Sequence, residues 1–195
     1  MTREEAKQHI IVSTINAIEK HGLANVTTRV IAEEAGINNA ALHYYFGTKE
    51  NLIEEALAAT LDHMLEDWFE MLGSDASVQN RLRNGFDYLI EGTLKYPNLI
   101  RAHLQGPLME GHADSPLVSL MSNWIDRTYT ELEADLTDEQ KRSVRIAMHA
   151  AISSILIATL IPNPPGLSSE IDLRDLGFRA QYIDFFVNGI LSQAA

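Results

Sequence analysis

The segment from Val26 to Lys49 constrains the fold of this chain more than any other part of the sequence. It reads VTTRVIAEEAGINNAALHYYFGTK. Gly36 adopts a left-handed backbone conformation at little cost, which ends one helix and permits a sharp turn into the next. Gly47 breaks the second helix. We therefore expect two short helices joined by a tight turn at Gly36.

Both short helices carry the residues that start a helix and bury one face. Thr27 and Thr28 precede the first, where a side-chain oxygen accepts from N–H groups of the first turn. Asn38 is a good N-cap for the second helix, and Leu42 and Phe46, four apart, give it a buried stripe. The inner face of the first helix is formed by apolar side chains: Val30, Ile31, Ala32 and Ala35.

The other side chains of the second helix are left facing outward: Asn39, Ala40, Ala41, His43, Tyr44 and Tyr45. Asparagine pairs with adenine edges, alanine contacts the thymine methyl group, and tyrosine and histidine bond phosphates. Thr48 caps the helix that follows, the fourth of the chain. Lys49 lies at the start of that helix, beside free N–H groups that can hold phosphate. This pattern is typical of a helix-turn-helix that reads the major groove. The alternative is a helical hairpin whose Tyr and His residues only cover a core.

A wider set of residues at fixed spacing runs from about Arg3 to Leu57. It comprises His21-Gly22, Val26-Thr27-Thr28-Arg29, Ile31-Ala32, Ala35-Gly36, Leu42-His43-Tyr44-Tyr45-Phe46, Lys49 and Leu52. This region resembles the N-terminal DNA-binding domain of the TetR family of bacterial transcriptional regulators. The resemblance implies base reading by Asn38, Asn39, Ala40, Ala41, His43, Tyr44 and Tyr45. It implies that phosphates are held by Thr27, Thr28, Arg29 and Lys49.

Two departures from the family pattern bear on base reading. His43 stands where many members have Tyr, and Ala40 and Ala41 offer no hydrogen bonds. Readout at the two alanines is expected through methyl contact or DNA shape.

Length and composition fit one small DNA-binding domain, residues 1–47, followed by a larger helical domain, residues 48–195. The chain has no cysteine, which excludes a disulfide framework and a thiol nucleophile and fits a reducing cytoplasm. No signal peptide is expected, because the first residues run into an amphipathic helix. The longest apolar run, Met148 to Ile161, is too short to span a membrane.

The net charge of −12 is unusual for a DNA-binding protein. Residues 1–50 hold five basic against six acidic side chains, a net of −1, so the remainder holds −11. The acidity therefore lies away from the expected DNA-reading segment. This distribution is compatible with a few placed phosphate contacts and excludes a nonspecific DNA coat, which needs many cations.

The sequence of the rest of the chain predicts further helices, whose ends are marked by Pro, Gly and Asp. Pro97 suits a first helical turn, Thr137 to Gln140 has capping-box form, and Asp172 is the expected cap of the last helix. The expected helices cover residues 48–72, 77–95, 97–105, 115–135, 137–161 and 172–193. With the three N-terminal helices this gives an all-α fold of about nine helices.

The last two helices are expected to form a homodimer, an inference that rests mostly on the resemblance. The final helix has a seam at three–four spacing: Leu173, Leu176, Ala180, Ile183, Val187 and Ile190. Large apolar side chains lie on its neighbouring faces: Phe178, Tyr182, Phe185 and Phe186. The preceding helix also carries more than one apolar stripe. The alternative is that these stripes serve only the monomer core.

The resemblance also implies a ligand cavity between the fourth helix and the fifth to eighth. An apolar cavity with a few polar groups is the usual small-molecule site, and this composition favours a small hydrophobic effector. The candidate lining residues are Met64, Trp68, Phe86, Tyr88, Ile100, His103, Leu104, Met109, Trp124 and Tyr129. The alternative is that these side chains are ordinary core. Binding of the effector is expected to shift the fourth helix and release the operator.

No catalytic, metal or cofactor site is expected, since HExxH, GxSxG and glycine-rich phosphate loops are missing from the sequence. We therefore predict a ligand-responsive transcriptional regulator, a repressor by analogy with its relatives, that binds a palindromic double-stranded DNA operator as a dimer. The alternative is a helical small-molecule-binding or interaction protein with a vestigial DNA-binding head.

Overall fold

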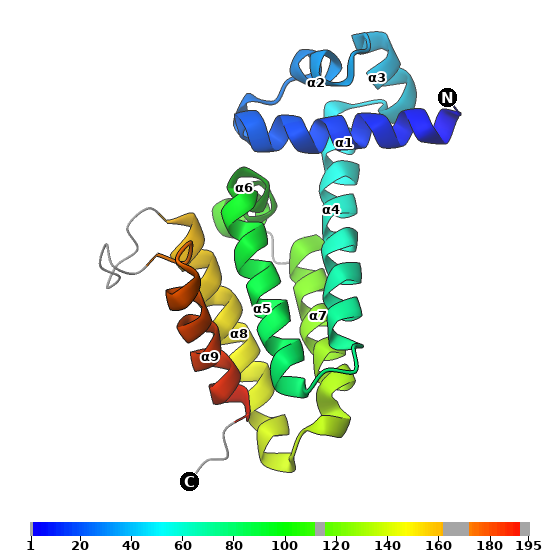
Figure 1. Cartoon of the computed structure of the whole chain (residues 1–195). Coiled ribbons are helices and arrows are strands. Elements are labelled where there is room, and N and C mark those ends of the chain that lie inside the picture. The colour runs from blue at the N-terminus through cyan, green and yellow to red at the C-terminus, as the bar shows by residue number, and fades with distance from the viewer. Residues whose placement is uncertain (1, 112–115, 162–171, 192–195) are drawn as a thin grey trace. The chain divides into compact units, whose positions relative to one another are not determined.

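Residues 2–111, 116–161 and 172–191 are described by the computed structural model. Within these ranges the chain forms nine α-helices and three single turns of 3-10 or π type, and no strand (Figure 1). The predicted all-α fold is therefore confirmed. None of the helices in these ranges combines the length and apolar character that crossing a membrane requires.

The helices follow one another with short connections. The first part of the chain forms α1 (Arg3–His21), η1 (Leu23–Asn25), α2 (Thr28–Ala35), α3 (Asn39–Phe46) and α4 (Lys49–Leu72). The second part forms α5 (Val78–Lys95), α6 (Pro97–Gln105), η2 (Gly106–Glu110), α7 (Pro116–Leu132), η3 (Glu133–Asp135), α8 (Asp138–Leu160) and α9 (Leu176–Leu191). From α4 to α8 the bounds lie within one residue of the predicted ones, except that α7 tightens into η3 three residues before its predicted end.

The start of the last helix corrects a prediction. The sequence predicts that Asp172 caps a helix from residue 172, but α9 begins at Leu176. The Asp172 carboxylate instead accepts a hydrogen bond from the Arg174 backbone N–H at 2.9 Å. Asp175 caps α9, because its Oδ1 accepts from the Phe178 N–H at 2.7 Å. Aspartate suits either position, so the sequence alone does not distinguish the two.

Two helices begin with reciprocal capping boxes. Thr137 Oγ1 accepts from the Gln140 N–H at 3.3 Å, and Gln140 Oε1 accepts from the Thr137 N–H at 2.8 Å. This is the predicted box at the start of α8. Thr2 and Glu5 form the same motif at the start of α1, with distances of 3.2 and 2.7 Å. Each box satisfies two backbone donors that a helix start leaves free.

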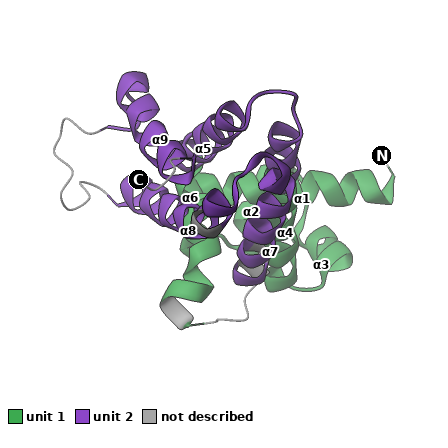
Figure 2. Ribbon diagram, turned by 90° about the horizontal axis from the view of Figure 1, so that it is seen from below, with its two compact units in different colours: residues 1–64, 96–117 green, residues 65–95, 118–195 purple. Residues whose placement is uncertain are grey.

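The chain divides into two compact units (Figure 2). Unit 1 comprises residues 1–64 and 96–117, and unit 2 comprises residues 65–95 and 118–195. The helix α6 therefore belongs with the N-terminal helices, although it lies far from them in sequence. The predicted domain boundary after residue 47 divides the chain by expected function and stays a prediction.

Unit 1 is built around a core shared by α1, α2, α3, the start of α4, and α6. Its buried residues include Ile10, Ile18, Ile31, Leu42, Phe46, Leu52, Leu99 and Ala102. Glu19 attaches the start of α6 to α1. Its carboxylate accepts from the Leu99 backbone N–H at 2.9 Å, and its carbonyl accepts from the Asn98 side chain at 2.8 Å. An acid at a helix N-terminus is favourable because the helix dipole is positive there.

Unit 2 has a larger aromatic core. Its fully buried side chains include Trp68, Leu82, Phe86, Met148, Ile155 and Val187. The Trp68 ring makes T-shaped contacts with Trp124 and Phe86, at centroid distances of 4.8 and 6.1 Å. Gly85 makes this possible, because a Cβ there would lie 2.6 Å from Trp68 Cζ3. The helix α5 thus carries glycine at the point where the indole packs against its backbone.

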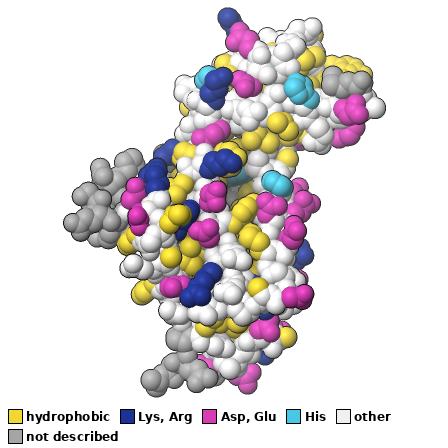
Figure 3. All heavy atoms as spheres, in the orientation of Figure 1, with side chains coloured by type: hydrophobic (Ala, Val, Ile, Leu, Met, Phe, Trp, Pro, Cys, Tyr) yellow, Lys and Arg dark blue, Asp and Glu magenta, His cyan; other side chains and the backbone are white. Residues whose placement is uncertain are grey.

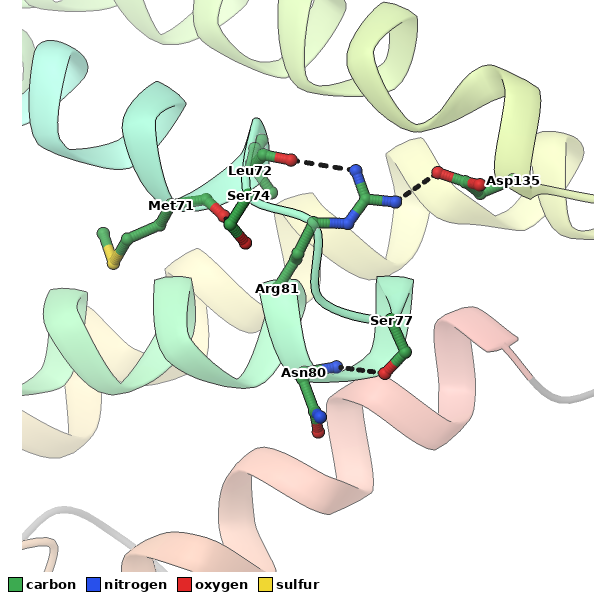
Figure 4. Close-up of polar contacts among 7 residues, drawn as sticks. All are labelled: Met71, Leu72, Ser74, Ser77, Asn80, Arg81 and Asp135. Carbon is green, nitrogen blue, oxygen red and sulfur yellow. Dashed lines mark hydrogen bonds and ion pairs between the residues drawn. The ribbon is translucent and has the colours of Figure 1, made fainter.

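Arg81 ties three segments of unit 2 together (Figure 4). Its guanidinium donates to the Leu72 carbonyl at the end of α4, at 2.8 Å, and pairs with the Asp135 carboxylate in η3. Capping the last carbonyls of a helix with a cation satisfies acceptors that lack a partner within the helix. Arg81 therefore fixes the turn between α4 and α5 against the end of α7.

Two crosswise ion pairs join α5 to α9. Arg83 on α5 lies 2.6 Å from Asp184, and Arg179 on α9 lies 3.1 Å from Asp87. Elsewhere, acidic and basic side chains are interspersed over the face of unit 2 visible in Figure 3. Exposed charges of that kind add little stability individually, whereas Arg179, whose side chain is 12% exposed, is the most buried member of the two pairs that join α5 to α9.

Candidate functional site

The turn between α2 and α3 forms as the sequence predicts. Gly36 is left-handed, with φ 65° and ψ 31°. The Ile37 N–H donates back to the Ala32 carbonyl at 3.0 Å, which closes the end of α2. Asn38 then caps α3, since its Oδ1 accepts from the Ala41 N–H at 2.9 Å. This geometry fixes the direction in which α3 leaves the turn.

The two faces of α3 divide as predicted. Leu42 and Phe46 are buried in the unit 1 core. Exposed side chains cover the opposite face: Asn39, Ala40, His43 and Tyr44. Ala41 and Tyr45 are half-buried at its edges, and Tyr44 is the most prominent aromatic residue, at 69% exposure. Five of the residues predicted to read bases are therefore exposed, namely Asn38, Asn39, Ala40, His43 and Tyr44, whereas Tyr45 packs against the unit 1 core.

His43 is held in a single orientation. Its Nδ1 lies 2.8 Å from the Gly47 carbonyl. A carbonyl only accepts, so Nδ1 donates in this contact and Nε2 stays free on the exposed face of α3. Nε2 is therefore the His43 atom that a DNA group can reach.

The predicted phosphate-binding residues lie at the starts of α2 and α4. Thr27 caps α2 by accepting from the Val30 N–H at 3.2 Å, which leaves its hydroxyl proton available to a phosphate. Lys49 Nζ lies 3.4 Å from the Val26 carbonyl, so it points toward the start of α2. Thr48 caps α4 through the Asn51 N–H at 3.1 Å, as predicted.

Arg29 differs from the other predicted phosphate ligands because it already has an acidic partner. Its Nε donates to Glu33 at 2.8 Å on the same exposed helix face. The hydrogen bond and charge of Glu33 raise the pKa of Arg29. A phosphate must therefore compete with this carboxylate for the guanidinium. Thr28, next to it, is half-buried in the first turn of α2.

Comparison with known proteins identifies the type of domain that carries this surface. The profile of the bacterial regulatory proteins of the tetR family matches residues 10–56, which span α1 to the start of α4. Residues 10–56 therefore form a domain of the tetR type. It is 36% identical to the HTH-type transcriptional regulator BetI of Brucella abortus over 78 residues, which cover 40% of this chain and 35% of BetI. Matches of this kind span about a third of the length of the BetI relatives.

Solved structures of similar fold match nearly the full length of the chain. A tetR-family transcriptional regulator from Streptomyces coelicolor has a TM-score of 0.69 and 20% identity, covering 97% of this chain and 80% of that one. The transcriptional regulator FadR from Bacillus subtilis, solved in complex with stearoyl-CoA, has a TM-score of 0.61 and 14% identity over 96% and 99% of the two chains. At these identities the likeness concerns the fold alone.

The predicted effector-binding residues fall into both units. Unit 1 contains Met64, Ile100, His103 and Leu104, whereas unit 2 contains Trp68, Phe86, Tyr88, Trp124 and Tyr129. The side chain of Met109 lies outside the described residues. In unit 2, Trp68, Phe86 and Trp124 lie together in the core with Tyr129 packed against it. Tyr88 instead donates to Asp67 at 2.7 Å and lines a shallow groove.

The two tryptophans differ in how their N–H groups are satisfied. Trp68 Nε1 donates to Thr128 Oγ1 at 3.0 Å. Trp124 is 3% exposed, and its Nε1 has no acceptor among the described residues. A buried donor without a partner costs about 1–3 kcal/mol. Trp124 is therefore the candidate whose buried polar atom is open to a ligand acceptor.

His103 is half-buried against α4 within unit 1. Thr60 Oγ1 donates to the Leu57 carbonyl at 2.7 Å and lies 2.9 Å from His103 Nε2, so it accepts from that nitrogen. Burial lowers the pKa of His103 to about 4, and the ring is neutral at physiological pH. The Thr60 partner and the Glu19 cap of α6 were not predicted, because neither has a local sequence signal.

Proposed function

We propose that this protein is a ligand-responsive transcriptional repressor that binds a palindromic DNA operator as a dimer and is released by a small hydrophobic effector. The observation that carries the proposal is the exposed face of α3, set between the Gly36 turn and Gly47 and presenting Asn39, His43 and Tyr44. The match of residues 10–56 to the tetR family supports it.

The outward face of α3 has the size and chemistry of a major-groove reader. Asn39 offers the amide that pairs with adenine, Ala40 and Ala41 offer methyl contacts, and His43 offers its free Nε2. The Thr27 hydroxyl and the Lys49 ammonium lie at helix starts, where N–H groups favour phosphate. In this arrangement α3 selects the sequence while α2 and α4 hold the DNA backbone.

The exposed surface of α8 and α9 supports the proposed dimer. Ile146 and Phe185 are 75% and 74% exposed, and Ile157 is 51% exposed. A groove of about 440 Å³ between these helices is lined by Ala147, Ala150, Phe185, Phe186, Asn188 and Gly189. By contrast, Ile183, Val187 and Ile190 of the predicted seam are buried in the unit's own core. In this dimer, two copies of α3 read half-sites about 34–36 Å apart, or a multiple of that spacing.

The aromatic core of unit 2 supports a hydrophobic effector. The Trp68, Phe86 and Trp124 cluster is apolar and closely packed, and the buried Trp124 N–H has no acceptor among the described residues, so an effector would enter by displacing these rings. A site of this type takes an apolar ligand with a single acceptor oxygen. The stearoyl-CoA bound by the FadR relative is a ligand with a long apolar chain.

The position of α6 in unit 1 suggests how the effector would act. The helix is fixed to α1 through Glu19 and to α4 through the contact of His103 with Thr60. An effector that displaces α6 or α4 would therefore move α1 and, with it, α3. Operator binding must in turn weaken effector binding by the same factor, a coupling of about 1–3 kcal/mol in typical cases.

The test is selection of DNA fragments from the source genome on the purified protein, followed by fluorescence anisotropy of the best fragment across a salt series. We expect nanomolar affinity for a near-palindrome and much weaker binding to shuffled DNA. Equal, weak binding to both by protein that has been refolded to remove bound ligand would refute the proposal. That result, combined with effector binding, would establish the alternative of a vestigial DNA-binding head.

A further inference from the structure

The basic residues of the segment 1–64 are not equally available to DNA. Three of them are paired with acids on neighbouring helices or turns: Lys7 with Glu55 at 2.6 Å, Lys20 with Glu34 at 3.3 Å, and Arg29 with Glu33 at 2.8 Å. Within the described part of this segment, Arg3 and Lys49 have no acidic partner. Lys49 is already a predicted phosphate ligand, whereas Arg3 is not.

Arg3 lies beside the exposed face of α3. Its guanidinium carbon is 5.7 Å from the centroid of the Tyr44 ring, a cation–π distance. The Tyr44 ring in turn makes a T-shaped contact with Tyr45 at 5.0 Å. Arg3 therefore extends the row of outward side chains on α3 by one residue that comes from α1.

The start of α1 holds Arg3 in this position. The capping box of Thr2 and Glu5 fixes the first turn, and the Glu5 carboxylate is occupied by the Thr2 N–H at 2.7 Å. Glu4 accepts from the Gln8 amide at 3.4 Å. Both neighbouring acids thus have partners of their own, and Arg3 keeps its positive charge unpaired.

Lys7 provides an internal comparison. It is one helical turn after Arg3 on the same face of α1, and its ammonium lies 5.3 Å from the centroid of the Phe46 ring. Each of the two cations therefore lies beside an aromatic ring of α3, Arg3 beside Tyr44 and Lys7 beside Phe46. Because Glu55 binds the Lys7 ammonium, only Arg3 presents charge at the outer end of this row.

We propose that Arg3 binds a DNA phosphate next to the groove occupied by α3, and that the first turn of α1 is part of the DNA interface. This inference rests on the proposed function. A guanidinium beside a ring has no acidic partner to displace, and its N–H groups can donate two parallel hydrogen bonds to a phosphate. The Tyr44 ring would orient these N–H groups outward beside the bases.

The experiment compares Arg3→Gln with Lys20→Gln, in the full chain, on the selected operator fragment. Each variant removes one positive charge from an exposed part of α1, but Lys20 is paired with Glu34. We expect Arg3→Gln to weaken operator binding about tenfold or more. Because a dimer carries two copies, the slope of log K against log salt concentration should fall by about 1.8, twice the 0.9 expected per phosphate contact.

Lys20→Gln should change affinity less than about twofold and leave the salt slope unchanged. Equal affinities and equal slopes for the two variants would overturn the proposal and make the Arg3 contact with Tyr44 purely structural. Circular dichroism melting identifies any loss of fold, and Arg3→Lys, which keeps the charge, should retain most of the slope. Failure of the unmodified protein to prefer the operator would instead refute the proposed function.

Discussion

Two glycines on α5 offer a direct test of how unit 2 is packed. A Cβ at Gly85 would lie 2.6, 2.8 and 3.1 Å from three atoms of the Trp68 ring, whereas a Cβ at Gly92 would have nothing within 4 Å. The Trp68 ring is fully buried and its N–H is bonded to Thr128. It therefore has no room to move away from a new methyl group.

The same substitution should have opposite effects at the two positions. Glycine to alanine inside a helix stabilises by about 1 kcal/mol because it restricts the unfolded chain. Gly92→Ala receives this gain alone. Gly85→Ala has the same gain, but overpacking against the Trp68 ring lowers its unfolding free energy by about 1–3 kcal/mol. The difference in unfolding free energy between the two variants removes the shared helix contribution, and we expect it to be about 1–3 kcal/mol in favour of Gly92→Ala.

The measurement is urea denaturation followed by circular dichroism and by tryptophan fluorescence. Both tryptophans of the chain, Trp68 and Trp124, lie in this core, so the fluorescence transition reports the unfolding of unit 2. Gly85→Ala should also alter the native emission spectrum, while Gly92→Ala should not. Equal stabilities of the two variants would show that the indole does not pack against α5 as described.

Three further predictions concern α6, the dimer and the reading face. Burial holds the pKa of His103 near 4 against 6.5 in the unfolded chain, so protonation favours unfolding. Between pH 6.5 and pH 4, the unfolding free energy of the native protein should fall by up to about 3 kcal/mol more than that of His103→Asn. Parallel pH profiles of unfolding free energy for the two proteins would contradict this. Phe185→Asp should give monomers in sedimentation velocity, whereas Leu108→Asp, an equally exposed apolar position in η2, should leave the dimer intact. Tyr44→Ala should weaken operator binding by about 1–3 kcal/mol and change the melting temperature by no more than a few degrees. Unchanged anisotropy titrations would show that the exposed face of α3 does not read the bases.

Local signals made most of the fold predictable from the sequence. The Gly36 turn, the Asn38 cap and the Thr137 capping box each depend on residues a few positions apart, and the structure forms all three. The last helix was misplaced because Asp172 and Asp175 both suit an N-cap. The assignment of α6 to unit 1 was beyond local reasoning, since it depends on contacts between residues about 80 positions apart.

The candidate DNA-binding surface was also largely readable from periodicity. Leu42 and Phe46 had to point inward, which placed Asn39, His43 and Tyr44 outside. Pairing between distant charges was not readable, because Lys7 and Glu55 are brought together only by the fold. The pair of Arg29 with Glu33 is local, one helical turn apart, and has a signal in the sequence. The contact of Arg3 with Tyr44 has no such local signal. The predicted effector residues remain the least defined, because aromatic side chains at helical spacing serve both cores and ligand sites.

The place of α6 bears on whether such regulators can be recombined. A chimaera that joins residues 1–47 of this protein to another sensor would keep Glu19 but lose the helix whose start Glu19 caps. It would also expose the surface of the N-terminal core that Leu99 and Ala102 complete. A transplant would have to carry α6, or a matching helix, together with the reading helices. The N-terminal helices of this chain are therefore not a self-contained unit, because part of their core is supplied by a segment about 80 residues later in the sequence.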